Sequence, residues 1–351
     1  HDETRERAIS DRLLQIGWIG NHLDSRSSLA VEAIRNRIAE GDVDGAKAMV
    51  PKLLNPDDSR SLLITNTSRA VWRDVEAWAG PRLDRQWPIY LQEARQRWVA
   101  GKTSISAHDY LNALMSAGDY ETAVDDLLPL LQQPRKEDWE LMFMMAPMAK
   151  ALAKLGRWKD AERLFEHAQE VWPLGSQANA LNISANYSIF LLKEGRANAA
   201  LERIDVSLAD ARKWGPEASE QAFAGMQHQR ACVLHELGRD PEAAASVAQA
   251  LAVERGSAAA LLHLCIGDRA AAKEALLDAL RNESTRDDVL EFMQAPGDAP
   301  WPSEYGRRER ASIDDLRSDL DLREAVERYG RVLPWRVNEA ENQIPPVVSA
   351  R

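Results

Sequence analysis

The chain carries Gly156-Arg157-Trp158-Lys159-Asp160-Ala161-Glu162 near its middle, followed by Phe165, Ala168 and Pro173. The same spacing, a glycine followed five positions later by an alanine, recurs at Gly41/Ala46, Gly118/Ala123, Gly195/Ala200, Gly238/Ala243 and Gly267/Ala272. The glycines at 118, 156, 195, 238 and 267 are 38, 39, 43 and 29 residues apart. A period of this length indicates a small supersecondary unit that buries its apolar face by stacking on its neighbours. It favours a binding function over catalysis.

The composition supports a helical array with a substantial core. The chain has 351 residues, of which 45% are hydrophobic, and alanine and leucine dominate. These residues lose little side-chain entropy in a helix, so the composition favours α-helix. The formal net charge is -11 at pH 7 and the sequence pI is about 5.3. Such an acidic balance argues against nucleic acid or anionic lipid as a general partner.

The cellular compartment is left open. The two cysteines, Cys232 and Cys265, neither indicate a disulfide framework nor match the spacing of zinc ligands. No apolar stretch approaches the ~20 residues that span a bilayer, so we expect no direct membrane insertion by this segment. The first residue is His1 and not Met, as expected if a signal peptide or anchor has been removed. A periplasmic location is therefore favoured over a cytoplasmic one.

The segment 142–173 resembles a tetratricopeptide repeat. Its second half matches the pattern of that family at the positions of Gly156, Trp158, Ala161, Phe165, Ala168 and Pro173. In its first half the packing positions hold Met145, Met148, Ala149 and Leu152, where the family prefers Trp, Leu, Gly and Tyr. The resemblance extends in weaker form over residues 27–285, in six or seven units. It implies an all-α, right-handed superhelical solenoid of tetratricopeptide-like helix hairpins.

Three regions follow from this interpretation. Residues 1–26 are expected to form an N-terminal capping helix over 5–23, and residues 27–285 the repeat array, degenerate over 27–100 and clearer over 104–281. Residues 286–351 are expected to form a C-terminal capping helix, near 309–329, and a Pro-containing tail. The capping segment also resembles the closing helix of bacterial arrays of this family. The expected helix pairs are 104–117 with 119–132, 138–155 with 158–171, 177–194 with 197–213, 218–237 with 240–254, and 257–266 with 268–281.

The resemblance also implies a concave groove that binds an extended peptide or a partner helix. The first helix of each pair lines this groove, mainly 10, 6, 3 and 2 residues before the turn glycine. Counting back from the turns gives the candidate peptide-binding residues His108, Asn112, Lys150, Lys154, Lys193, His228, Cys232 and His235. The amides Asn182, Asn186 and Gln229 of the same helices complete the set. The lysines predict a partner with acidic groups, and the amides could bond a peptide backbone. The alternative is that the lysines are ordinary solvated positions. The ordered lysine and asparagine clamp of chaperone-binding members is not reproduced.

One helical face carries His228, Cys232 and His235, which raises the question of a metal or a nucleophile. Seven residues rise ~10.5 Å along a helix, too far for both histidines to reach one ion. Cys232 would need a lowered pKa and an oriented base to act as a nucleophile, and neither is visible in the sequence. Phosphate-binding glycine loops and the common hydrolase motifs are absent from the sequence. We therefore predict no catalytic residue, no metal and no cofactor.

The tryptophans divide into two groups. Trp72, Trp78, Trp87, Trp98 and Trp158 lie on apolar helical stripes and are expected in the core. Trp301 and Trp335 lie in proline-rich segments and are expected to contact either the array itself or a partner.

The function predicted from the sequence is a non-catalytic scaffold or adaptor that holds a protein or peptide partner in its groove. A first alternative is the sensory or regulatory portion of a larger, membrane-anchored signalling protein. A second is an enzyme that uses the face of His228, Cys232 and His235. The sequence identifies neither the partner nor the oligomeric state.

Overall fold

The computed structural model describes residues 9–10, 12–18, 20–215, 218–295, 301 and 303–336. Within these ranges all regular structure is helical, and the one β-type contact is an isolated antiparallel bridge between Thr65 and Gly330. The expectation of an all-α fold is therefore confirmed. The proline-rich residues 296–300 and 302 and the expected tail from residue 337 lie outside the described ranges.

The N-terminal part contains shorter and less regular helices than the rest. They are α2 (Ser25–Ala39), α3 (Val43–Met49), η1 (Val50–Lys52), α4 (Pro56–Ile64), η2 (Asn66–Val71), α5 (Trp72–Ala79) and α6 (Gln86–Gly101), the two η elements being 3-10 helices. A single capping helix over 5–23 is not formed, because the described helical residues end at Gln15 and a turn follows. Gly80 ends α5 and separates it from α6. Of the five tryptophans expected in the core, Trp78 is exposed and the other four are partly buried against the hydrophobic cores.

The regular helix pairs occur where the sequence predicts them. They are α7 (Ser104–Ala117) with α8 (Tyr120–Leu131), α9 (Trp139–Lys154) with α10 (Trp158–Val171), α11 (Ala180–Lys193) with α12 (Ala197–Trp214), α13 (Glu220–Glu236) with α14 (Asp240–Leu251), and α15 (Gly256–Cys265) with α16 (Arg269–Arg281). Gly118 and Gly156 adopt φ values of 75° at the turns within their pairs, a conformation that strains residues with a Cβ. The alanines that follow, such as Ala161 and Ala200, are fully buried. Small residues there let the two helices of a pair approach closely.

The C-terminal part differs from its prediction. A single helix near 309–329 is wrong: the chain forms α18 (Glu304–Arg317) and α19 (Leu320–Tyr329) instead. The break lies at Asp319, whose side chain accepts a hydrogen bond from the Leu322 N–H and starts a new helix. A further helix that we did not predict, α17 (Glu283–Phe292), begins at Asn282, whose side chain accepts from the Ser284 N–H.

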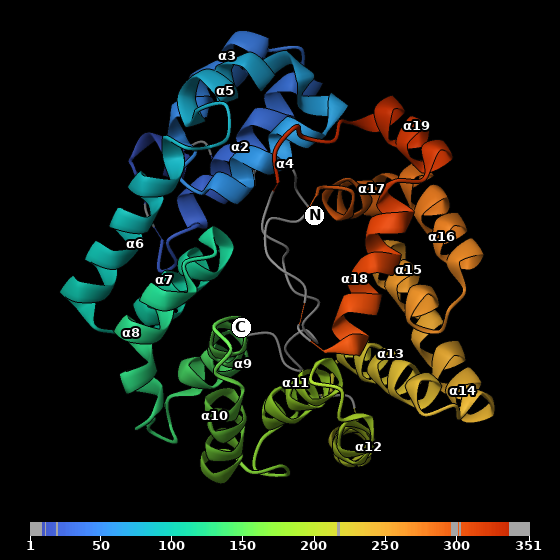
Figure 1. The fold of residues 1–351 in the computed structure, drawn as a ribbon. Coiled ribbons are helices and arrows are strands. Elements are labelled where there is room, and N and C mark those ends of the chain that lie inside the picture. The colour runs from blue at the N-terminus through green and yellow to red at the C-terminus, as the bar shows by residue number, and fades with distance from the viewer. Residues whose placement is uncertain are drawn as a thin grey trace.

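The two ends of the described chain meet and close a ring (Figure 1), with α17 packed on α4 and α19 on η2. A second hydrophobic core joins residues from both ends, including Ile34, Leu62, Leu290 and Val326. This core is separate from the larger one, which runs through the middle pairs. The ends of the array therefore cover each other's apolar faces, and the chain is not an open ribbon with two independent caps.

Arg331 makes the closest contacts of this closure. Its main-chain N–H donates to the Ile64 carbonyl at 2.9 Å, and its Nε donates to the Leu63 carbonyl at 2.6 Å. Its Nη2 pairs with Glu76 Oε1 at 2.7 Å, and the guanidinium lies 4.0 Å from the centroid of the Trp72 ring. One side chain thus combines backbone bonds, an ion pair and a cation–π contact at the junction of the two ends.

The helix α18 lies on the inner side of the ring (Figure 1), where it contacts α11, α15 and α16. Its N-terminus is capped by Ser303, whose hydroxyl accepts from the Gly306 N–H at 3.0 Å and donates to the Lys193 carbonyl. Because Lys193 is near the end of α11, this bond ties the start of α18 to the middle of the array. The C-terminal segment therefore covers part of the face on which the groove was predicted.

Candidate functional site

A cavity of about 550 Å³ lies between α11, α13, α15 and α18. Five of the predicted peptide-binding residues line it, namely Lys193, His228, Gln229, Cys232 and His235. On the opposite side it is lined by residues of α18, including Tyr305, Arg308, Glu309 and Ile313. The sequence pattern therefore predicts part of the wall that α11 and α13 form, and not the parts that α15 and α18 supply.

Ion pairs connect α18 to the inner faces of the array. Lys193 Nζ lies 2.7 Å from Glu309 Oε2, and Arg308 pairs with Glu236. Between these pairs the ring of Tyr305 is buried, and this burial, with the nearby Glu309 and Glu236 charges, raises the pKa of its hydroxyl well above 10.0. The charges of the cavity wall are thus arranged as matched pairs that hold α18 in place.

Trp301 lies next to this cavity, against α9 and α11, and is 8% exposed. The ammonium groups of Lys154 and Lys193 lie 5.4 and 5.8 Å from the centroid of its ring, which packs on the Trp158 ring at 5.3 Å. The expectation that Trp301 contacts either the array or a partner is confirmed for the array. Trp335 likewise packs against the second core.

Beneath Trp301 a space of about 20 Å³ remains, lined by Lys150 and Asn186 among others. Lys150 is buried here and is not a solvated position. Asn182 and Asn186 are buried as well, and Asn186 Nδ2 donates to the Asn182 carbonyl at 2.9 Å and to its Oδ1 at 3.2 Å. In this arrangement the two amides bond each other beneath a covered surface.

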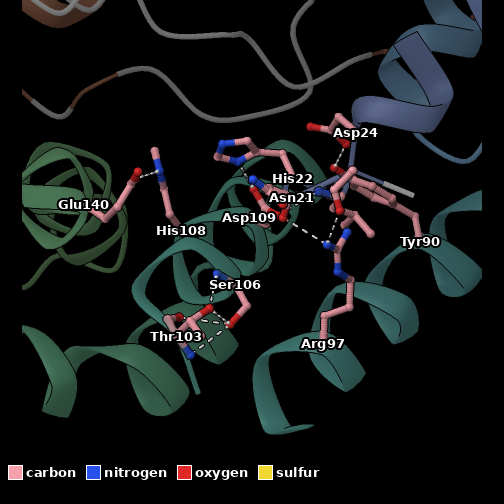
Figure 2. A network of polar contacts seen from close by, with 12 residues as sticks. Asn21, His22, Asp24, Tyr90, Arg97, Thr103, Ser106, His108, Asp109 and Glu140 are labelled. Carbon is pink, nitrogen blue, oxygen red and sulfur yellow. Dashed lines mark hydrogen bonds and ion pairs between the residues drawn. The ribbon is translucent and has the colours of Figure 1, made fainter. Parts of the chain in front are cut away.

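The two remaining predicted residues, His108 and Asn112, belong to α7 and are not among the residues lining the cavity. Asn112 is exposed, whereas the Nδ1 of His108 lies 3.1 Å from Glu140 Oε2 on α9. Figure 2 shows this pair facing each other across the gap between the two helices.

The same view shows how the loop before α2 is attached to α6 and α7 (Figure 2). Asp109 is buried and accepts from the Leu23 N–H at 2.7 Å, while its Oδ1 lies 3.0 Å from His22 Nδ1. The Tyr90 hydroxyl donates to Asp24 at 2.6 Å. Burial raises the pKa of Asp24, an effect that this hydrogen bond opposes. We interpret this network as structural, because its polar groups satisfy one another.

The cavity also contains a cluster of soft and basic ligand atoms. Cys232 of α13 and Cys265 at the end of α15 form a disulfide, with their Cα atoms 5.3 Å apart. His228 lies one turn before Cys232, and its Nδ1 is 2.8 Å from Oε2 of Glu254, whose side chain is 4% exposed. His235 does not join the cluster; its Nδ1 pairs with Asp240 at 2.7 Å.

The sequence reasoning did not predict the disulfide or the role of Glu254. Two cysteines separated by 33 residues form no recognisable framework, and Glu254 lies in a connection between helices. A usable signal did exist, because Cys265 stands two positions before Gly267 and Leu264 and Leu261 stand three and six before it. All three line the cavity. Counting back from this last turn glycine therefore places Cys265 and the two leucines on the cavity wall, but it gives no signal for Glu254.

Comparison of the chain with protein-family models and with curated proteins gives no match. Among the residues that the structure describes, no helix is both long enough and apolar enough to cross a membrane.

Proposed function

We propose that this chain is a non-catalytic scaffold whose inner groove binds a segment of a partner protein, in competition with its own Trp301 and α18. The observation that carries the proposal is that this internal segment already covers the groove with an aromatic ring and a carboxylate. A groove that accepts these groups from its own chain has the chemistry to accept them from a partner.

The proposal includes the finer architecture, a right-handed superhelical solenoid of tetratricopeptide-like hairpins. Two features support it. The first helices α7, α9, α11, α13 and α15 each contact the next one along the series, as they do when hairpins stack in register. Five of the candidate residues also lie on the cavity wall, and Lys150 and Asn186 lie beneath Trp301. The exceptions are Lys154, Asn182 and the two candidates on α7.

The chemistry of the partner follows from the internal contacts. Trp301 stacks near two ammonium groups, and Glu309 pairs with one of them, so the groove favours a segment with an aromatic residue followed by a carboxylate. The aromatic anchor would supply most of the affinity, because interface energy concentrates in buried aromatic residues. Charge complementarity with the lysines would then set the on-rate and the selectivity.

A labelled synthetic peptide of residues 301–312 tests this proposal when it is added to the full chain carrying Trp301→Ala. We expect saturable binding in fluorescence anisotropy, because the substitution removes the competing internal ring. Adding Lys193→Glu should weaken the affinity about tenfold or more, since it places like charges opposite each other.

The matched control is Lys159→Glu, which reverses an exposed lysine on the outer helix α10. It should leave the affinity for the peptide unchanged. Absence of binding to the Trp301→Ala chain, or an equal loss with Lys159→Glu, would contradict the proposed groove.

A further inference from the structure

We infer that Cys232, Cys265 and His228 form a site for a single thiophilic divalent cation of the zinc class once the disulfide is reduced. The ligand atoms of the three side chains lie within 4.8 Å of one another, and they are the only such group among the residues described. In tetrahedral zinc sites the bonds are ~2.0–2.3 Å long, which places the ligand atoms of one ion roughly 3–4 Å apart. Small side-chain rotations would therefore bring the three atoms around one ion.

The fold supplies the ligands from two neighbouring helices. His228 and Cys232 are four residues apart on α13 and so share one face, and Cys265 ends α15 beside them. This arrangement differs from the one rejected on helical geometry, since Cys265 takes the place of His235. The two cysteines and His228 line the cavity. A fourth coordination position would thus open into the cavity rather than into the core.

Glu254 orients the histidine for this role. Its carboxylate contacts His228 at Nδ1, so an N–H at Nδ1 directed to the carboxylate leaves Nε2 as the nitrogen with a lone pair. Histidines that bind metals commonly donate their second ring nitrogen to a carboxylate in this way. The contact of Glu254 with His228 would thus hold the ring with its Nε2 available to the ion.

Reduction and metal binding balance as two separate steps. A phosphine reductant and one water convert the disulfide to two thiols: the phosphine is oxidised to its oxide, and both protons of the water end on sulfur. A cellular dithiol would serve the same purpose by becoming a disulfide itself. Zinc then displaces the two thiol protons to solvent and binds two thiolates and the neutral imidazole. Oxidation to the disulfide therefore abolishes the metal site, and reduction restores it.

The test uses the full chain and cobalt(II) as a spectroscopic probe for zinc. After phosphine reduction without oxygen, the wild-type chain should bind one equivalent of cobalt with a thiolate-to-metal charge-transfer band, and zinc should displace it. The oxidised chain should show no such band. Zinc should raise the Tm of the reduced chain and leave that of the oxidised chain unchanged.

Variants separate this site from incidental metal binding. His228→Ala and Glu254→Gln should each lower the cobalt affinity about 10–100-fold. His235→Ala is the matched control, because it removes the other cavity-lining histidine of α13, which also pairs with a carboxylate; its affinity should equal that of the wild type.

Three results would overturn the inference. They are a folded reduced chain that shows no charge-transfer band, an equal loss of affinity with His235→Ala, and a reduced chain that unfolds and is not refolded by zinc. Far-UV circular dichroism of the reduced wild type and of the Cys232→Ser/Cys265→Ser double variant identifies the third case.

Discussion

The ion pair between Lys193 and Glu309 gives the sharpest test of how α18 is held in the groove. The pair joins α11 to α18 with 2.7 Å between Nζ and Oε2, and the two side chains are 17% and 27% exposed. A hydrogen bond between charged groups contributes ~1.5–3 kcal/mol, and partial solvent screening reduces this value. We therefore expect a coupling free energy of about 1–2 kcal/mol for this pair.

A double-mutant cycle measures this coupling. Lys193→Met and Glu309→Gln alone should each lower the free energy of unfolding, because each removes this ion pair. The double variant should cost less than the sum of the two single losses, and the difference is the coupling. The assay is urea unfolding followed by far-UV circular dichroism, at one pH and one salt concentration. The control cycle uses Lys47 and Asp44, an exposed pair at 4.0 Å whose coupling should be near zero. Equal coupling in the two cycles would refute the contact between α11 and α18 through this ion pair.

Three further predictions concern other parts of the fold. Burial raises the pKa of Asp58 from 3.8 to about 6, so the folded chain holds the proton of this carboxyl more tightly than the unfolded chain. The stabilisation from this proton is complete below pH 3.8 and is lost as the pH rises through 6. As the pH falls through this range, Asp58 should add about 3 kcal/mol to the free energy of unfolding, and Asp58→Asn should abolish this gain. Urea unfolding at several pH values measures it; the same pH dependence in the variant and the wild type would contradict the prediction. Arg331→Ala should lower the free energy of unfolding by about 2–3 kcal/mol through its lost ion pair and backbone bonds, whereas the exposed Arg328→Ala should cost under ~0.5 kcal/mol; equal losses would count against ring closure. Gly156→Ala should lower the Tm by straining a φ of 75°, and Gly101→Ala within a helix should raise it; the reverse order would refute the turn geometry.

The helix pairs between residues 104 and 281 could be predicted because their signals are local. A turn glycine, an alanine five positions later and an apolar stripe on each helix all lie within one repeat. Gly118 and Gly156 illustrate this, since each needs the left-handed conformation at the turn that its position predicts. The predicted bounds of α7 and α10 agree with the structure at both ends.

The ring closure and the covered groove could not be predicted because their contacts join segments far apart in the sequence. Arg331 contacts Leu63 across 268 residues, and Lys193 contacts Glu309 across 116. Neither end carries a local pattern that specifies its partner. The repeat pattern placed five of its eleven candidate residues on the cavity wall, but it contains no information on which segment covers them.

The central claim is that α18 and Trp301 cover a groove that a partner segment can enter. Hydrogen exchange of the α18 amides in the 351-residue chain, with and without an excess of the peptide of residues 301–312, tests it most directly. We predict faster exchange over Glu304–Arg317 when the peptide is present, because the peptide displaces this segment from α11 and α15. Unchanged or slower exchange over α18 at saturating peptide would contradict the claim.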